Sequence, residues 1–590
     1  MSGERDVSKA RDALAQAEAS FRRGRWPETI AHCERALALE STLVPGLSLL
    51  AAACQRQGLT ARALQALERA AVLAPLSADA HFNVGALRCQ TGDFAGGVAA
   101  LEAAYRIEPA TTTVDLLAQA LNARGNAQRS TAPNLAREDF ARALSLRPAE
   151  VGYALNLGNA EVALGNYAAA VAVLRQAAAR APRNTDVRLS LSRALIGEGS
   201  FDSAIAEAER AVRDSGGDAR ARVNLGAALG RAGRPEQAVA VYRTALAADP
   251  RQAAVWANLG NILQELADID GAIDAYDRAL AVDPRLPTAI EQRGLALLLG
   301  GRLREGWRAF LDREVMQGRA KDFHRQPLPD DLTGKTILVR RDQGLGDEIF
   351  FLRFIGRLKA RGARVLYEAG AKLVPVLAGW PAIDGLSTIG TTGDFVVAVS
   401  DLPYLLGSGD ADYPESIRLG PSAGALTAAR HLLVAAGPPP YLGLTWRAGT
   451  PNDPKSLYKE APPDRLIEVL RGQRHTVVSL QRAARSGELD HLRTGLGRPV
   501  ADAGAFNDDL ATMLALLSLL DEYVTVSNTN VHLRETVRRP SRVLIPTPEF
   551  RWMAKGDESP WFPLTKLYRR TPAHDWTPAL AALARDLSGN

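Results

Sequence analysis

Two residue types recur along the first half of this chain with a spacing of 34 residues. One series consists of prolines: Pro75, Pro109, Pro148, Pro182, Pro250 and Pro284. The other consists of glycines, with an alanine in one place: Gly24, Gly58, Gly92, Gly165, Gly199, Gly233, Ala267 and Gly301. A fixed period of this length is typical of helix–turn–helix units that stack into a solenoid. Such an array usually holds a protein or peptide, so any chemistry is expected in the residues that follow it.

The best-formed unit, residues 253–284, reads AAVWANLGNILQELADIDGAIDAYDRALAVDP. Its small residues, such as Gly260, let two helices approach closely, while Trp256 and Tyr276 fill the space beside them. The unit resembles the tetratricopeptide repeat, and about nine such units fit between residues 9 and 315. An insertion around NAQRSTAPN stretches the fourth repeat, and GRLREGWRAFLDRE, which has no closing proline, is expected to be a terminal cap.

Composition narrows the function classes. The 590 residues exceed a single core, and the formal net charge of +5 is nearly balanced, without the charge clusters of a nucleic-acid-binding surface. The polar N-terminus lacks a signal peptide, and no apolar stretch is long enough to span a membrane. The three cysteines, Cys33, Cys54 and Cys89, favour a reducing compartment over a disulfide framework. We therefore expect a cytoplasmic protein that does not bind nucleic acid and has no membrane span.

Four asparagines occupy one repeat position, two residues before a repeat glycine: Asn83, Asn156, Asn224 and Asn258. Stacked repeats turn equivalent positions into a ladder. An amide offers a donor and an acceptor, which suits the backbone of an extended peptide. The pattern resembles the asparagine ladder of O-linked N-acetylglucosamine transferases and implies an acceptor-peptide site; the alternative is that each asparagine only bonds its neighbours.

The second half carries a different pattern. Residues 335–367 contain an apolar run, a glycine turn, an amphipathic helix and another apolar run, which predicts a βαβ unit. A second start, YLGLTWRAGT, follows the segment GPPP at 437–440. We therefore predict an all-α repeat superhelix over 1–315, a linker over 316–334, and an α/β domain over 335–590.

Five segments make the functional prediction for the second half more specific: QGLGDEIFFLRF, KEAPPDRLIEVL, VVSLQ, SNTNVHL and EFRWMAKGDESPWFP. Their order resembles the heptosyltransferase-like family, and the combination with repeats resembles the flagellin-modifying glycosyltransferases of the Caulobacter type. The resemblance implies a GT-B fold of two Rossmann-like halves, 335–436 and 441–590, with the active site between them. It also implies that the repeats bind flagellin and that a nonulosonic acid is the sugar.

The resemblance assigns the general base to Asp347, which ends the glycine turn. A carboxylate there can take the proton from an acceptor hydroxyl and give an inverting transfer; the alternative is that Asp347 caps the following helix. The amides of Gly344 and Gly346, at the same helix start, can receive an anionic group of the donor.

The second half is expected to hold the nucleotide-sugar donor. Lys459 matches the family lysine that contacts phosphate, and Arg447 can grip a phosphate or carboxylate with two bonds; either can instead be an ordinary surface charge. Gln481, the last residue of the VVSLQ segment, is also predicted to bind the donor. These three residues form the first part of the predicted donor site.

The segment SNTNVHL supplies the second part of that site. A helix start with Asn528 and Thr529 is suited to phosphate, and His532 matches the family histidine. The chain departs from the family at Ser527 and Asn528, where heptosyltransferases carry Asp-Thr, which puts an ADP-heptose donor in doubt.

Three late residues leave alternatives open, and no metal is expected. Trp552, Lys555 and Trp561 can wall the cleft or, as for most tryptophans, belong to the core. The pair Asp410 and Asp412 falls in a loop-like stretch, so we predict neither a metal nor a cofactor.

The sequence thus predicts an inverting protein O-glycosyltransferase that recruits flagellin through its repeats. Two alternatives remain. One is a non-catalytic repeat scaffold with a degenerate GT-B domain, favoured by Ser527 and Asn528. The other is a polysaccharide or lipid-carbohydrate transferase with an accessory repeat array.

Overall fold

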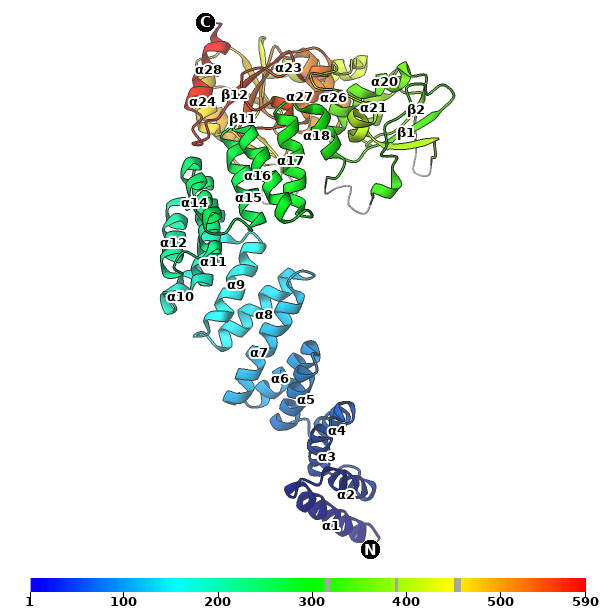
Figure 1. The fold of residues 1–590 in the computed structure, drawn as a ribbon, viewed down its shortest axis with the longest axis vertical. Helices are drawn as coiled ribbons and strands as arrows, with labels where there is room; N and C mark the ends of the chain where they lie inside the picture. Colours follow the sequence, from blue (N-terminus) through cyan, green and yellow to red (C-terminus); the bar gives the residue numbers. More distant parts are fainter. Residues whose placement is uncertain (1, 314–318, 388–390, 450–457, 590) are drawn as a thin grey trace. The chain divides into compact units, whose positions relative to one another are not determined.

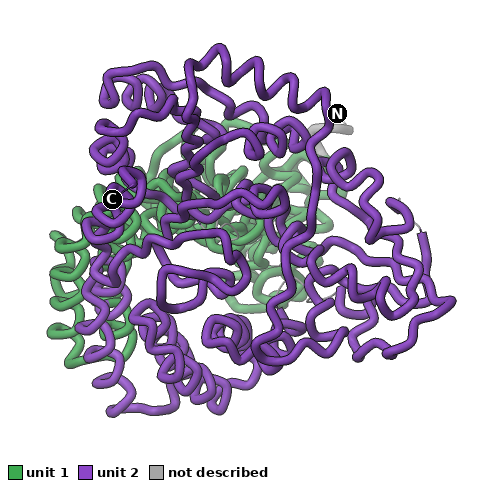
Figure 2. The backbone as a smooth tube through the Cα atoms, turned by 90° about the horizontal axis from the view of Figure 1, so that it is seen from above, with its two compact units in different colours: residues 1–224 green, residues 225–590 purple. Residues whose placement is uncertain are grey.

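The computed structural model describes residues 2–313, 319–387, 391–449 and 458–589. It divides into two compact units, residues 1–224 and 225–590, which Figure 2 shows in green and purple. The first unit consists of repeat helices alone. The second contains the last repeat helices together with all the described strands, so repeat helices and sheets share one compact body.

The repeat helices pack in successive pairs (Figure 1). Their bounds are α1 Ser2–Arg22, α2 Trp26–Leu39, α3 Val44–Arg56, α4 Thr60–Leu73, α5 Ala78–Gln90, α6 Phe94–Ile107, α7 Thr111–Gln128, α8 Pro133–Leu146, α9 Val151–Ala163, α10 Tyr167–Arg180, α11 Thr185–Glu198, α12 Phe201–Asp214, α13 Ala219–Arg231, α14 Pro235–Ala248, α15 Ala253–Glu265, α16 Ile269–Val282, α17 Pro287–Leu299 and α18 Leu303–Phe310. These nine pairs among the described residues confirm the predicted all-α repeat array.

The glycine period has a backbone cause. Each residue of that series lies in the turn between the two helices of a pair and has a positive φ, from Gly24 at 71° to Gly301 at 77°. Glycine adopts this conformation without a steric penalty, and Ala267 adopts it at 56°. The close approach of the two helices in a pair also needs glycine, because a Cβ on Gly260 would lie 2.5 Å from the Tyr276 ring.

The insertion in the fourth repeat is absorbed by its first helix. Helix α7 has 18 residues, whereas the equivalent helices α5 and α9 have 13. Gly125 on α7 still packs against the Phe140 ring of α8. The two helices α7 and α8 therefore keep their close packing, and the additional residues lengthen α7 before the turn to α8.

The segment predicted as a terminal cap packs into the second unit. Leu303 and Trp307 on α18 are buried, and the Trp307 ring meets the edges of Phe351, Phe550 and Trp561. A cap facing solvent would present polar residues. Helix α18 instead contributes to the core beneath the sheets.

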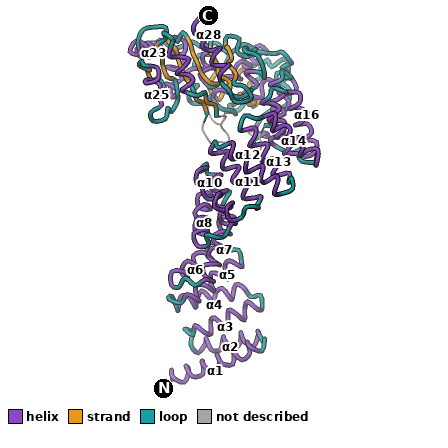
Figure 3. Tube along the Cα trace, turned by 90° about the vertical axis from the view of Figure 1, so that its left-hand side faces the viewer, coloured by secondary structure: helices purple, strands orange, loops and turns teal. Residues whose placement is uncertain are grey.

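The sheet region begins after the repeats, and its strands are orange in Figure 3. Its strands are β1 Thr336–Arg340, β2 Arg364–Glu368, β3 Gly385–Leu386, β4 Phe395–Ala398, β5 Tyr441–Thr445, β6 Arg447–Ala448, β7 Lys459–Glu460, β8 Thr476–Ser479, β9 Val500–Asp502, β10 Glu522–Val526, β11 Ser541–Ile545 and β12 Thr565–Arg569. Its helices are η2 Ala320–Asp322, α19 Leu345–Phe351, η3 Leu352–Phe354, α20 Ile355–Ala360, α21 Val374–Leu377, η4 Val399–Asp401, α22 Leu402–Leu405, α23 Ala423–Ala436, α24 Pro463–Arg471, α25 Glu488–Leu496, η5 Gly504–Asp508, α26 Leu510–Leu519, α27 Thr529–Thr536, η6 Phe550–Trp552 and α28 Thr577–Ser588.

Two parallel sheets organise this region, as predicted for an α/β fold. The first has the order β3-β2-β1-β4 and the second β12-β11-β10-β5-β8-β9. In each sheet the chain starts at an inner strand, β1 or β5, and later strands add on both sides. The crevice at the carboxyl end of such a starting strand is where open α/β sheets bind ligands. The short strands β6 and β7 form a separate antiparallel hairpin.

Candidate functional site

A cavity of about 600 Å³ lies at the carboxyl ends of β5, β8 and β10, where the strand order of the second sheet reverses. We call it the switch-point cavity. Its lining includes four of the predicted donor-site residues: Arg447, Gln481, Asn528 and Thr529. Arg482 and Arg485 line it as well. The sequence predicted the first four without placing them on one sheet edge, and it missed the two further arginines.

Arg447 follows β5 and is 6 % exposed. Its guanidinium pairs with Glu488, with 3.0 Å from Nη2 to Oε2, and lies 3.7 Å from Glu460. The hydrogen bond to Glu488 raises the pKa of Arg447, which keeps the side chain charged. It is therefore a buried, oriented cation rather than the surface charge that the sequence left as the alternative.

Gln481 ends the strand region of β8 and is buried. Its Oε1 accepts the backbone N–H of Arg447 at 2.9 Å, and its Nε2 donates to the Arg447 carbonyl at 3.1 Å. Nε2 also donates to the carbonyl of Arg482 at 3.0 Å. The amide thus fixes the loop that carries the arginines, which makes Gln481 a positioning residue for the cavity.

Helix α27 starts at the edge of this cavity. Asn528 is its N-cap, because its Oδ1 accepts the backbone N–H groups of Asn530 at 3.0 Å and Val531 at 3.2 Å. Its Nδ2 donates to Thr525 at 2.8 Å. The Asn528 carboxamide therefore has a structural role as the helix cap, and Asn528, Thr529 and Asn530 all border the cavity.

His532 lies one turn further along α27 and is 4 % exposed. Burial, reinforced by the charges of Arg353 and Lys459, lowers the pKa of His532 to about 3. The ring packs edge-on against Phe562, and its Nδ1 has no hydrogen-bond partner among the described residues. The imidazole is thus neutral, and it supports α27 without lining the switch-point cavity.

The glycine turn of the first half packs against the same helix. Gly344 is the exposed N-cap of α19. A Cβ on Gly346 would lie 3.4 Å from Thr529 Oγ1 and 3.5 Å from His532 Cδ2. Gly346 therefore allows the close approach of α19 to α27, while Gly344 is exposed.

A second cavity, of about 690 Å³, collects the remaining predicted residues. We call it the reaction cavity. Asp347 lines it from the first half, and Lys459, Glu549 and Arg551 line it from the second. The structure thus brings Asp347 and Lys459 together and places Lys459 apart from the switch-point cavity that holds Arg447.

These groups form a chain of alternating charge. Asp347 pairs with Arg551, and Arg551 lies 3.9 Å from Glu549. Glu549 accepts a hydrogen bond from Lys459 at 2.9 Å, and Lys459 donates to Ser527 at 3.1 Å. Ser527 immediately precedes the α27 cap, so this chain of contacts connects the reaction cavity to the edge of the switch-point cavity.

Glu549 and Arg551 are residues that the sequence analysis missed. Both lie in EFRWMAKGDESPWFP, in which only the tryptophans and Lys555 were predicted as candidates to border the cleft. The Glu549 side chain is 8 % exposed, and its Oε1 lacks a partner among the described residues. It places a carboxylate beside Ser527, where the sequence suggested that one had been lost. A signal existed in the alternating acidic and basic residues after a buried strand.

The tryptophans of that segment belong to the core. Trp552 and Trp561 are completely buried. They pack among the aromatic rings around Phe350 and Phe562. The alternative in which they wall the cleft is therefore wrong, whereas Lys555 is exposed and borders two other cavities.

Arg313 also borders the reaction cavity, and the sequence did not single it out. It follows α18 and enters the crevice at the ends of β1 and β4. Its guanidinium pairs with Asp342 and Asp401 and donates to Ser400 at 2.6 Å. The residue that ends the described repeat region thus fills the ligand-binding position of the first sheet with a protein side chain.

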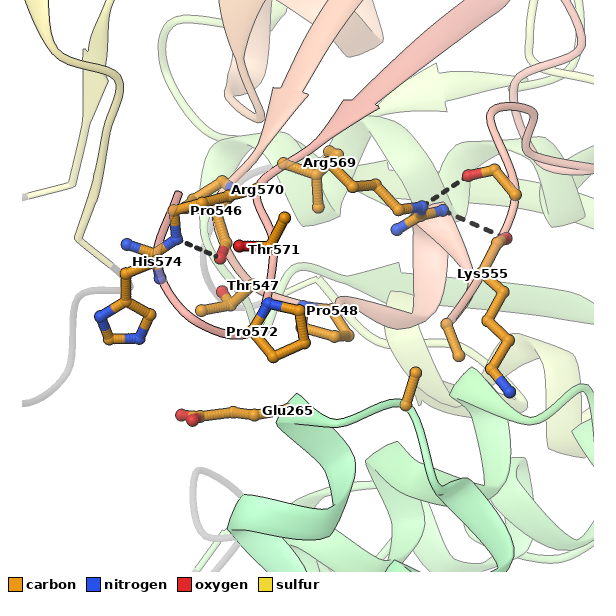
Figure 4. A pocket seen from close by; sticks show the side chains of 14 residues that line it. Glu265, Pro546, Thr547, Pro548, Lys555, Arg569, Arg570, Thr571, Pro572 and His574 are labelled. Atoms are coloured by element: carbon orange, nitrogen blue, oxygen red, sulfur yellow. Dashed lines mark hydrogen bonds between the residues drawn. The ribbon is translucent and has the colours of Figure 1, made fainter. Parts of the chain in front are cut away.

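Figure 4 shows a smaller cavity of about 340 Å³ next to the reaction cavity. Glu265, at the end of α15, faces two loops: the one after β11, which carries Thr547 and Pro548, and the one after β12, which carries Pro572. Arg570 donates from Nε to the Pro546 carbonyl at 3.1 Å, which links the two loops. We call this space the flanking cavity, because it shares lining residues with the reaction cavity.

The four ladder asparagines lie on the first helices of their repeats, and their surroundings differ. Asn83 is exposed on α5, and Asn258 is half-buried on α15. Asn156 donates to Asn122 at 2.7 Å. Asn224 is 9 % exposed, donates to the Leu189 carbonyl at 3.4 Å, and leaves its Oδ1 without a partner among the described residues. Neither the peptide site nor the neighbour-bonding alternative is decided by this placement.

No helix among the described residues is long and apolar enough for a membrane crossing. Nor do their His, Cys, Asp and Glu side chains gather in groups of three that suit a metal ion.

Known proteins resemble the two parts of this chain to different degrees. Residues 161–229 match one tetratricopeptide repeat family, and residues 50–110, 127–185, 223–290 and 257–322 match a second family of the same description. The first half therefore carries tetratricopeptide repeats, as the period predicted.

Protein FlbA of Caulobacter vibrioides is 25 % identical over 339 residues, which cover 50 % of this chain and 54 % of FlbA. The chain thus spans about half the length of this relative. Among solved structures, a tetratricopeptide protein of Thermus thermophilus has 22 % identity and a TM-score of 0.28, covering 31 % of this chain and 99 % of its own. Yeast Tom70 has 13 % identity and a TM-score of 0.31, covering 53 % and 84 %.

Proposed function

We propose that this chain is an inverting protein O-glycosyltransferase with a GT-B domain over 335–590. In this proposal the repeats hold an acceptor protein, expected to be flagellin, in the cytoplasm. The α/β region transfers a sugar, expected to be a nonulosonic acid, from a nucleotide-activated donor to a Ser or Thr hydroxyl. The observation that carries the proposal is the meeting of Asp347 with Lys459 in one cavity, beside a second cavity at the switch point. The partial match to Protein FlbA of Caulobacter vibrioides, over 339 residues, supports it.

The switch-point cavity suits the donor nucleotide. Arg482 and Arg485 are exposed on its rim, while Arg447 lies buried in its wall. Arginine forks bind phosphate or a sugar carboxylate with two bonds, and Thr529 at the start of α27 borders the same cavity. This distribution of cations supports a donor whose phosphate lies against the ends of β5 and β10.

The reaction cavity suits the transfer. Asp347 accepts the proton of the acceptor hydroxyl while the oxygen bonds to the anomeric carbon. The bond from that carbon to the phosphate oxygen breaks on the opposite face, which inverts the configuration. Lys459 supplies a positive charge for the leaving phosphate, and Glu549 holds the lysine in place at 2.9 Å. Asp347 must release Arg551 to take the proton, so acceptor entry and this ion pair are coupled.

Thermal shift with nucleotide sugars tests the donor site. CMP-, UDP-, GDP- and ADP-linked sugars are added to the full chain, and at least one is expected to raise the melting temperature. The double change Arg482→Ala and Arg485→Ala should reduce that shift, because it removes two cations proposed to bind the donor phosphate. Both side chains are exposed, so the variant should still fold. Arg474→Ala, at an exposed position before β8, is the matched control. A panel without any shift argues for the other candidate.

That second candidate is a repeat scaffold with an inactive α/β domain. The ion pair of Asp347 with Arg551 favours it, because the pair occupies the proposed base. It predicts that the chain binds its protein partner with unchanged affinity in the presence of any nucleotide sugar and never transfers a sugar.

A further inference from the structure

One wall of the reaction cavity comes entirely from the last repeats. Helix α15 contributes Asn261, Gln264 and Glu265, and helix α17 contributes Glu291, Gln292 and two leucines. Among these described residues none carries a positive charge. The opposite wall holds Asp347, Lys459, Glu549 and Arg551. A phosphate is therefore poorly suited to the repeat wall, whereas a neutral chain with N–H donors suits it.

One atom of that wall lacks a partner. The Oε1 of Gln264 is buried and has no hydrogen bond among the described residues. A buried acceptor in this state costs free energy until a donor reaches it. Asn261, one turn earlier on α15, accepts a bond from the Tyr276 hydroxyl at 2.8 Å and keeps its amide N–H groups. The wall thus offers amide groups at the spacing of successive helix turns.

The space also continues beyond the reaction cavity. The flanking cavity of Figure 4 shares Glu265, Thr547 and Pro548 with it, so the two adjoin along the end of α15. Their volumes are about 690 and 340 Å³. A space that continues past the reacting groups can hold several residues of an extended polypeptide, which rises by about 3.3 Å per residue.

We infer that Gln264 and Gln292 form an acceptor subsite, at which an extended segment of the acceptor polypeptide lies with its backbone against the amides of α15 and α17. Its Ser or Thr then faces Asp347, and the residues on one side continue into the flanking cavity. This subsite rests on the proposed transferase function and is distinct from the asparagine ladder, because Asn258 does not line either cavity. The carboxylates of Glu265 and Glu291 disfavour acidic residues beside the modified position.

Kinetics of the full chain with recombinant flagellin test the subsite. Gln264→Ala with Gln292→Ala should raise the KM for flagellin by about fivefold or more, since each loses hydrogen bonds to the acceptor. The KM for the nucleotide sugar and the thermal shift it causes should stay unchanged. Gln237→Ala, an exposed glutamine on α14, is the matched control. An unchanged KM for flagellin in a folded, active double variant overturns the subsite alone.

Hydrogen exchange separates this failure from failure of the proposed function. Flagellin added to the wild-type chain should slow exchange in residues 258–265 and 287–299, and the double variant should lose that protection. Protection without any sugar transfer would support the binding subsite and contradict the transferase. Sugar transfer without protection at these helices would support the transferase and contradict the binding subsite.

Discussion

Arg313 and Asp401 form a buried ion pair, with 2.6 Å between the guanidinium Nη1 and the carboxylate Oδ1. The arginine follows the last repeat helix, and the aspartate follows β4 of the first sheet. The pair therefore joins the repeats to the sheet inside one compact unit. It also places a protein side chain at the carboxyl ends of β1 and β4, the switch point of the first sheet.

Removal of this arginine should destabilise the second unit strongly. Arg313→Ala leaves Asp342 and Asp401 buried without their cation, and breaking such a pair costs about 3–5 kcal/mol. Denaturant unfolding of the full chain measures the loss. The exposed pair of Arg302 with Glu305 is the control, and Arg302→Ala should cost less than about 1 kcal/mol. Equal effects of the two changes would contradict the anchoring role.

The sheet region should need the last repeats to fold. Leu303 and Trp307 are buried against Phe351 and Trp561, so a chain cut at residue 330 exposes that core. We expect residues 218–590, which keep α13 whole, to be folded and to bind nucleotide. Residues 330–590 should aggregate or lack a cooperative melting transition. Calorimetry of both fragments checks this, and a stable 330–590 fragment would show that α18 is dispensable.

The proposed base gives a kinetic prediction. Asp347→Asn keeps the shape and a hydrogen bond to Arg551 but cannot accept the proton, so sugar transfer should fall by about 100-fold or more. Nucleotide binding should persist, because Asp347 does not line the switch-point cavity. Asp322→Asn, at an exposed position on η2, is the control. Undiminished transfer by Asp347→Asn removes the residue from the mechanism.

The asparagine ladder gives a prediction about acceptor binding, with an exposed asparagine outside the ladder as the control. Replacing Asn83, Asn156, Asn224 and Asn258 by Ala should weaken acceptor binding by roughly 30-fold or more, at about 0.5–1.5 kcal/mol for each lost hydrogen bond. Asn134→Ala, at an exposed position on α8, should change nothing. Circular dichroism of the quadruple variant is needed because Asn224 is buried. Unchanged affinity in a folded variant would mean that the asparagines only bond their neighbours.

His532 should make stability depend on pH. Its pKa is about 3 in the folded chain, because of burial and then the charges of Arg353 and Lys459, whereas an unfolded histidine titrates near 6.5. Below pH 6.5 the unfolded chain takes up a proton that the folded chain cannot, so this contribution is complete above 6.5 and is lost toward pH 3. His532→Phe should flatten the fall of the unfolding free energy by up to about 1.4 kcal/mol per pH unit. Identical pH profiles of wild type and variant would exclude this.

The local pattern of the sequence determined the repeats. The αL turns at Gly24 and its equivalents and the tight contact at Gly260 depend on neighbours within one repeat, so period and residue size suffice to predict them. The alternation of strands and helices after residue 335 likewise predicted two parallel sheets. The family resemblance indicated Asp347 as a candidate base, and the position of Arg447 just after an apolar strand indicated a candidate for phosphate binding.

Tertiary structure decided which of these side chains share a site. Lys459 meets Glu549 across 90 residues of sequence, and Arg313 meets Asp401 across 88. No periodicity links such positions, because long-range ion pairs depend on where the sheets and the last repeats come together. For the same reason the sequence could not show that the Gln481 side-chain amide hydrogen-bonds the backbone of Arg447. Nor could it show that Trp552 and Trp561 lie in the core. Local spacing specifies helices and turns, whereas only the packed fold sets the charge environment of a buried group.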